Sequence, residues 1–211
     1  MTKPNYPPKP FRENRRDVLI DMIQELRLGL IVTSPALDAV HVPVLVKQDG
    51  DKLYLESHVG VANPIWKESD GLDALVVFQG PQAYVHPGWY ETKKQTGKAV
   101  PTWNYISVQA RGTIETRQDA AWLRAHVDAL SQVMESGQAE PWAIDDAPDD
   151  YIIDMLGGIV GLRIEVTSLE GIWKMSQNHP KANRVGAADG LGAGDDFEVA
   201  EIMRDLEAGR R

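Results

Sequence analysis

The spacing of apolar residues changes as the chain leaves its N-terminal segment. In residues 14–27 apolar side chains recur every three or four positions, which predicts an amphipathic helix. From Leu28 onward short apolar runs and strict alternation replace that spacing, and both are typical of β-strands. An Asp49-Gly50 pair marks a turn between two of them. The strands are predicted at residues 28–34, 40–47 and 53–57. Together they predict a β-meander.

The second half of the chain alternates between the same two patterns. The longest alternating stretch, residues 103–116, predicts a strand with one apolar face. Helical spacing returns in residues 119–136 and again in residues 197–206, the latter behind a glycine-rich loop at 190–194. Two further strands are predicted at residues 74–79, ended by Gly80-Pro81, and at residues 160–166, continuing after a turn into residues 171–175.

The order of these elements favours an antiparallel sheet. Residues 28–57 hold several strands with no room for the helical crossover that parallel strands require. No internal repeat or linker divides the chain, and four prolines in residues 1–11 indicate an extended N-terminal arm. We therefore predict one α+β domain over residues 1–211, an antiparallel barrel decorated by helices and ending in a C-terminal helix.

Composition narrows the range of partners. The net charge of −9 disfavours direct DNA binding by the isolated chain, although a dimer could concentrate one basic strip. The densest basic cluster, Arg12, Arg15 and Arg16, is interrupted by Glu13 and is typical of a solvated helix face. No apolar run is long enough for a membrane span and no signal peptide is visible. We expect a cytoplasmic location, and the absence of cysteine is compatible with it.

Three strings combine aromatic residues with polar ones. They are residues 58–66, residues 101–105 and residues 173–178, the last reading Trp-Lys-Met-Ser-Gln-Asn. A large aromatic side chain next to several hydrogen-bond donors suits a planar, anionic ligand. We interpret the third string in this way, as an aromatic wall outside the core.

Taken in order and spacing, these strings are similar to those of the PaiB family, described as FMN-binding negative transcriptional regulators. The resemblance covers nearly the full length. It is carried by residues 6–11, 41–44, 58–66, 89–93, 100–105, 158–161, 169–171 and 173–178. It implies a six-stranded split β-barrel of the FMN-binding type, a homodimer, and FMN at the subunit interface. It also implies a regulatory role.

The first string is the expected phosphate site. It follows a strand and opens a predicted helix at 62–67, whose N-terminal N–H groups would favour the FMN phosphate. Ser57, His58 and Asn63 are placed to hydrogen-bond it, or Asn63 simply caps the helix. Members of the family usually carry a basic residue where this chain has Val61, so FMN affinity depends on a substitute cation such as His58 or Lys174.

The other candidate residues lie near strand ends. Trp103 is predicted to stack on the flavin ring or to pack against a dimer partner. The resemblance implies that the end of the chain reaches the partner's flavin, so that Lys174, Ser176 and Gln177 act across the interface unless they form a structural loop. His41 is predicted to contact the flavin or to be a buried imidazole, and Pro43 beside it indicates an edge strand or a bulge.

No residue is compelling as a general acid or base, so we predict no catalytic residue. His86, His126 and His179 lack metal-ligand spacing, and His126 is expected to be structural. Three functions remain open. The first is a flavin-linked sensor that regulates transcription. The second is an FMN-dependent oxidoreductase or flavin-reductase-like enzyme, and the third is a binder of another planar anion such as haem or a deazaflavin.

Overall fold

The computed structural model describes residues 7–209 of the 211-residue chain. The strands are β1 Arg12–Glu13, β2 Leu28–Thr33, β3 Ala39–Pro43, β4 Leu45–Asp49, β5 Lys52–Gly60, β6 Asp73–Val85, β7 Thr102–Arg117 and β8 Ile159–Lys174. The helices are α1 Arg16–Leu26, α2 Ile65–Glu68, α3 Glu91–Thr96, α4 Ala120–Glu135, α5 Asp149–Gly157, α6 Lys181–Gly192 and α7 Phe197–Glu207. Short 3-10 helices span Lys9–Phe11, Pro87–Trp89 and Ile144–Asp146. Most of the predicted extended arm, residues 1–6, lies outside the described residues.

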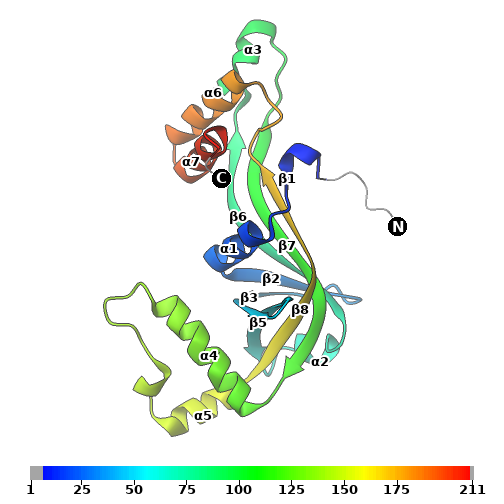
Figure 1. The fold of residues 1–211 in the computed structure, drawn as a ribbon, viewed down its shortest axis with the longest axis vertical. Helices are drawn as coiled ribbons and strands as arrows, with labels where there is room; N and C mark the ends of the chain where they lie inside the picture. The colour runs from blue at the N-terminus through cyan, green and yellow to red at the C-terminus, as the bar shows by residue number, and fades with distance from the viewer. Residues whose placement is uncertain (1–6, 210–211) are drawn as a thin grey trace. The chain divides into compact units, whose positions relative to one another are not determined.

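The strands form one sheet in the order β3-β2-β6-β7-β8-β5-β4, with β1 added on β8 (Figure 1). The pairs β1–β8, β2–β3, β2–β6, β4–β5 and β5–β8 are all antiparallel. This confirms the predicted α+β class and antiparallel sheet. Strand β3 stands at one end of the order, so Pro43, its last residue, lies on an edge strand as predicted.

The chain contacts itself in two compact units. Unit 1 comprises Met1–Leu19, Gln79–Val108 and Glu170–Arg211, and unit 2 comprises Ile20–Phe78 and Gln109–Leu169. The long strands β6, β7 and β8 each contribute residues to both units. The single domain expected from the sequence stays a prediction, and each unit is described separately below.

Unit 2 is built on the apolar face of the sheet. Ala110 and Ile114 of β7 are fully buried, as their alternation predicts, together with Leu162 and Ile164 of β8. Gly112 lies between the two β7 residues. A Cβ added there would be 2.1 Å from the backbone oxygen of Glu165, so only glycine permits this approach of β7 to β8.

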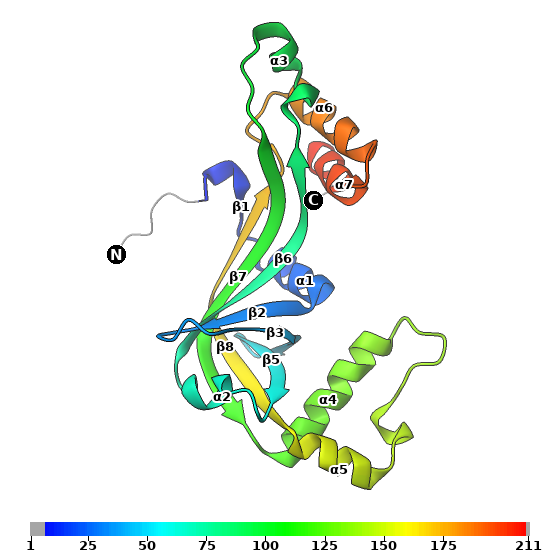
Figure 2. The same ribbon diagram turned by 180° about the vertical axis from the view of Figure 1, so that it is seen from behind.

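Unit 1 carries the helices that follow β8. Helices α6 and α7 pack side by side, as Figure 2 shows from behind. The ring of Trp89 lies against the backbone of Gly190, where a Cβ would be only 2.3 Å from the ring. The buried residues Leu191, Val199 and Ile202 form the core between the two helices. Helix α7 confirms the prediction at residues 197–206.

Three predicted boundaries are wrong. Strand β6 continues through Gly80-Pro81 to Val85. Its pairing with β2 ends at Val77, so Pro81, which has no N–H, is not needed as a donor to β2. Strand β8 is continuous where a turn was predicted before Gly171. The glycine-rich loop predicted at residues 190–194 begins later, since α6 continues to Gly192.

One predicted strand is also divided. The alternating stretch 40–47 separates into β3 and β4 at Val44, whose N–H donates to the carbonyl of Arg27 at 2.7 Å. The alternation in the sequence continues through this point, so the break depends on a contact that the pattern does not record. Within residues 7–209 no helix is long and apolar enough to cross a membrane.

Candidate functional site

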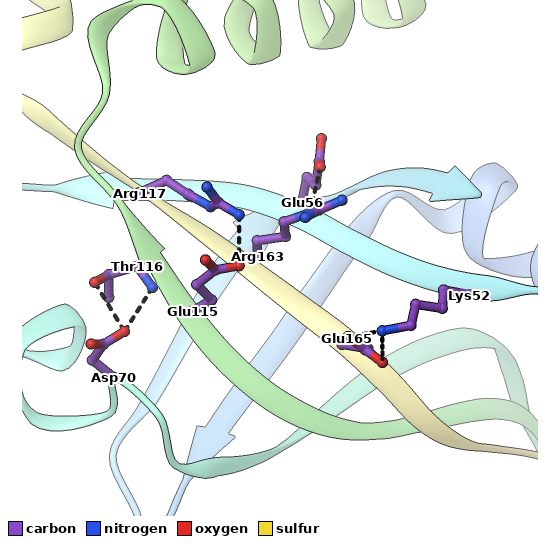
Figure 3. Close-up of polar contacts among 8 residues, drawn as sticks. All are labelled: Lys52, Glu56, Asp70, Glu115, Thr116, Arg117, Arg163 and Glu165. Atoms are coloured by element: carbon purple, nitrogen blue, oxygen red, sulfur yellow. Dashed lines mark hydrogen bonds and ion pairs between the residues drawn. The ribbon is translucent and has the colours of Figure 1, made fainter. Parts of the chain in front are cut away.

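One face of the paired strands β5 and β8 in unit 2 carries polar side chains. Tyr54, Glu56 and His58 share this face of β5, because successive side chains of a strand point to opposite sides. Arg163 of β8 stands opposite Glu56 and donates from Nε to its carboxylate at 3.2 Å (Figure 3). Its guanidinium carbon lies 3.7 Å from the centre of the Tyr54 ring. Glu56 is only 6% exposed, so its buried charge is compensated by Arg163.

The other contacts in Figure 3 lie nearer to solvent. Lys52 pairs with Glu165 at 2.9 Å, and more than two fifths of each side chain is exposed. Asp70 accepts from the backbone N–H and the hydroxyl of Thr116 at 2.8 and 3.0 Å. The exposed Lys52–Glu165 ion pair is screened by solvent and contributes little to stability. The Lys52–Glu165 and Asp70–Thr116 contacts hold the ends of strands. The Glu56–Arg163 pair, in contrast, is largely shielded from solvent.

A histidine pair lies at the far end of the same face. His58 stands opposite Gly161 in the strand register, and its Nδ1 is 3.1 Å from Nε2 of His126 on α4. The His126 ring stacks on Trp122 with centroids 5.1 Å apart and planes 7° apart. Gly161 makes room for this arrangement, since a Cβ there would be 2.1 Å from the Trp122 ring. Helix α4 therefore contacts His58 through His126, whose ring is stacked on Trp122.

Both rings of this pair are held neutral at pH 7. Burial, the neighbouring His58 and the Lys47 cation lower the pKa of His126 to about 4. Burial also lowers the pKa of His58. His126 is 3% exposed and its Nδ1 is buried without a hydrogen-bond partner. His58 is half-buried, and its Nε2 makes no hydrogen bond to any residue in the range 7–209. Of the two ring nitrogens without a partner, Nε2 of His58 is the one that is not fully buried.

Among the described residues, none of the remaining candidates in unit 2 has a hydrogen bond or ring contact with the His58 side chain. Ser57 is 2% exposed and faces the opposite side of β5, toward the core, because it neighbours His58 in the strand. The Oδ1 of Asn63 accepts from the N–H of Ile65 at 3.0 Å, which is the capping role weighed above. Helix α2 has only four residues, fewer than the predicted 62–67. His41 is exposed on the edge strand β3, so it is not a buried imidazole.

In unit 1 the string 173–178 is largely internal. Trp173 and Met175 are 5% and 2% exposed, so the expected aromatic wall outside the core is wrong. The cause is Gly171, where a Cβ would be 2.6 Å from the Trp173 ring and 2.3 Å from Leu19. Because Gly171 has no side chain, the indole and Leu19 can fill that space.

The polar residues of this string bond within the chain. Lys174 Nζ donates to the hydroxyl of Thr102 at 2.7 Å, and the hydroxyl of Ser176 donates to Oδ1 of Asn104 at 3.0 Å. Gln177 accepts from the N–H of Met175 at 2.7 Å and donates to the carbonyl of Trp173. Ser176 has a φ of 63°, a left-handed conformation that this network of bonds holds in place. These contacts give the three predicted ligand residues structural roles.

Two aromatic residues of unit 1 differ in exposure. Trp103 is 53% exposed, as its position on the non-core face predicts, and meets Tyr84 edge to face at 5.9 Å. Tyr90 is 1% exposed and stacks on His179 at 4.7 Å. Burial raises the pKa of the Tyr90 phenol, and its hydroxyl lies near Ser176 without a well-formed hydrogen bond. Of these two residues, Trp103 is the one whose ring is open to a ligand or partner.

The eight predicted site residues fall into two groups. His41, Ser57, His58 and Asn63 belong to unit 2, and Trp103, Lys174, Ser176 and Gln177 belong to unit 1. Sequence reasoning missed His126 as a contact of His58. The signal was present: Trp122 and His126 are four apart on one helix face, and a lone glycine at 161 interrupts a strand, which indicates a close approach. No group of three potential metal ligands occurs in the described part of the chain.

Comparison with known proteins identifies relatives over nearly the whole chain. A family model described as "Putative FMN-binding domain" matches residues 5–168. The "Protease synthase and sporulation protein PAI 2" of Bacillus subtilis is 28% identical, with 95% of this chain and 97% of that protein aligned. An uncharacterized protein of Emericella nidulans is 30% identical over 92% of this chain and 94% of its own.

A solved structure shares the fold. The FAD and heme binding protein from Mycobacterium smegmatis superposes with a TM-score of 0.54 and 18% identity, over 77% of this chain and 73% of that one. At this identity the likeness concerns the fold, which is that of the flavin-binding split barrels. The family match ends at residue 168, so β5, the His58–His126 pair and most of β8 lie inside it, whereas α6 and α7 lie beyond it.

Proposed function

Because the chain belongs to the family of FMN-binding domains, we propose that it is an FMN-binding homodimer that serves as a flavin-linked sensor in negative transcriptional regulation. FMN as the cofactor is supported by the family and by the fold. The observation that carries the regulatory part is the similarity to the Bacillus subtilis sporulation protein over 95% of the chain. FMN, when bound, supplies the redox chemistry, and this chain's residues bind and orient it.

The polar face of β5 and β8 fits an anionic group. The unpartnered Nε2 of His58 is a hydrogen-bond donor or acceptor, and Lys47 places positive charge near this histidine pair. We assign the flavin phosphate to this face, with His58 as its contact. The roles of Ser57, Asn63 and His41, and of Trp103, Lys174, Ser176 and Gln177 in unit 1, remain predictions.

The test is an FMN titration of the purified protein, followed by absorbance and by quenching of flavin fluorescence. We expect flavin absorbance bands or saturable quenching at micromolar FMN. A protein that neither carries flavin nor quenches its fluorescence would overturn the proposal. An enzyme of the oxidoreductase class would in addition oxidise a small-molecule reductant with turnover, which a sensor does not require.

Replacing Val61 by arginine is expected to tighten FMN binding about tenfold, which is about 1.4 kcal/mol. Val61 is 48% exposed and its backbone is fixed by bonds to Gly158 and Trp66, so a longer side chain can extend without disturbing β5. Val100→Arg is the matched control, because it adds the same charge at a site that is 75% exposed in unit 1. Equal effects of the two substitutions would argue against a phosphate near residue 61.

We expect the isolated protein not to shift DNA of its own promoter in a gel, even at low salt. The reason is its charge of −9, which opposes the release of counterions that drives DNA binding. Regulation would then depend on contacts with another protein or ligand. A shift at about 50 mM salt that weakens steeply by about 200 mM would show direct binding to DNA phosphates and contradict this expectation.

A further inference from the structure

We propose that His126 is a positioning residue that fixes neutral His58 with its proton on Nε2, so that His58 presents a hydrogen-bond donor to the anion bound at this face. The identity of that anion as the FMN phosphate rests on the proposed function. The position of the His58 proton does not, because it follows from contacts within this chain alone.

The contact between the two rings is a hydrogen bond in which one ring donates its N–H and the other accepts it. His58 Nδ1 and His126 Nε2 are 3.1 Å apart, a hydrogen-bond distance, and the rings meet edge to face at 75°. A neutral imidazole has one N–H and one bare nitrogen. Either His126 donates to a bare Nδ1 of His58, or His58 donates from Nδ1 to a bare Nε2 of His126.

The buried Nδ1 of His126 decides between these arrangements. If His58 donated, the proton of His126 would lie on Nδ1, which is buried without a partner. A buried N–H without an acceptor is rarer in proteins than an acceptor without a donor. We therefore assign the His126 proton to Nε2. His58 Nδ1 is then the acceptor, and the proton of His58 lies on Nε2.

His126 is held firmly enough for this role. Its ring stacks on Trp122, whose backbone N–H is capped by Asp119 at 2.8 Å at the start of α4. Its environment keeps it neutral, so it orients His58 without adding a charge. A carboxylate in this place would instead raise the pKa of His58.

The charged neighbours on this face do not compete for the same nitrogen. Glu56 on β5 is paired with Arg163 on β8, and Lys47 on β4 has no acceptor atom. Lys47 adds positive potential for an anion, while His126 sets the direction of the His58 donor. The three residues thus supply charge, orientation and contact from β4, α4 and β5.

The proton positions can be read by long-range proton–nitrogen NMR correlation on ¹⁵N-histidine-labelled protein at pH 7.5 without FMN. We expect a bare Nδ1 and a protonated Nε2 on His58. The His58→Gln variant assigns the signal. His86 is an internal reference, since its Nδ1 accepts from the N–H of Gly88 at 3.0 Å and its proton must also lie on Nε2. A His58 ring protonated on Nδ1 would overturn the proposal. Because this measurement uses the unaltered protein, it does not depend on whether any variant folds.

Two substitutions separate positioning from packing. His126→Phe keeps the stacking on Trp122 but removes the donor, so we expect His58 to become a mixture of both tautomers and FMN to bind about tenfold more weakly. His126→Gln retains an N–H donor and should restore most of both. An unchanged His58 tautomer in His126→Phe would refute the positioning role. A protein with the expected tautomer that does not bind FMN would refute the proposed function and leave the positioning role standing.

Discussion

Gly112→Ala is expected to lose at least about 4 kcal/mol of unfolding free energy, one of the largest effects that a single methyl group can have. The added Cβ would lie 2.1 Å from the backbone oxygen of Glu165, 2.8 Å from its carbonyl carbon and 2.8 Å from Ile164. Backbone atoms of a central strand cannot move aside as a flexible side chain can. Relief of the clash would therefore separate β7 from β8.

Urea denaturation of the wild type and the variant measures this loss. Gly137→Ala is the matched control, because no atom lies within 4 Å of the Cβ position there. At a site without strain the same substitution is neutral or stabilises by about 0.4–1 kcal/mol. A loss of less than about 1 kcal/mol at Gly112 would mean that the sheet adapts to a methyl group at this position.

The sequence predicts strands and helices well where one face is buried. Alternation placed Ala110 and Ile114 in the core, and helical spacing predicted α1, α4 and α7 within a few residues of their ends. The same rules failed at Gly80-Pro81 and before Gly171. Pro81 lies where β6 is no longer paired with β2, so the strand can continue through it. Gly171 lies inside β8, where it allows the close approach of Leu19 and Trp173.

The candidate site was less predictable, because its contacts join residues far apart in the chain. The fold and the choice of His58 followed from the resemblance and the strand pattern. The pairing of His58 with His126 joins residues 68 apart through the packing of α4 on Gly161, which no local pattern contains. Ser57 shows the opposite case: a residue adjacent to His58 in sequence points away from it, as strand geometry requires.

Lowering the pH from 7.5 to 4.5 is expected to cost the protein up to about 2 to 3 kcal/mol through His126 alone. In the unfolded chain this residue has its ordinary pKa of 6.5, whereas the folded state lowers the pKa to about 4. Between these values the unfolded state binds a proton that the folded state excludes. Stability is therefore complete above about pH 6.5 and falls as the pH approaches 4. Lowering of the His58 pKa adds a loss of the same sign.

The His126→Phe variant isolates this contribution from the carboxylates that also titrate in acid. Phenylalanine can stack on Trp122 but takes up no proton, so the fall in urea midpoint between pH 7.5 and pH 4.5 should be smaller in the variant. The slope of the transition should be the same in both proteins, which would show that the change is in stability. Equal falls in midpoint would mean that His126 is already protonated in the folded protein at pH 4.5. The histidine pair would then carry a charge in mild acid. His126 can act as a neutral donor to His58 at pH 4.5 only if its pKa is lowered in the folded protein.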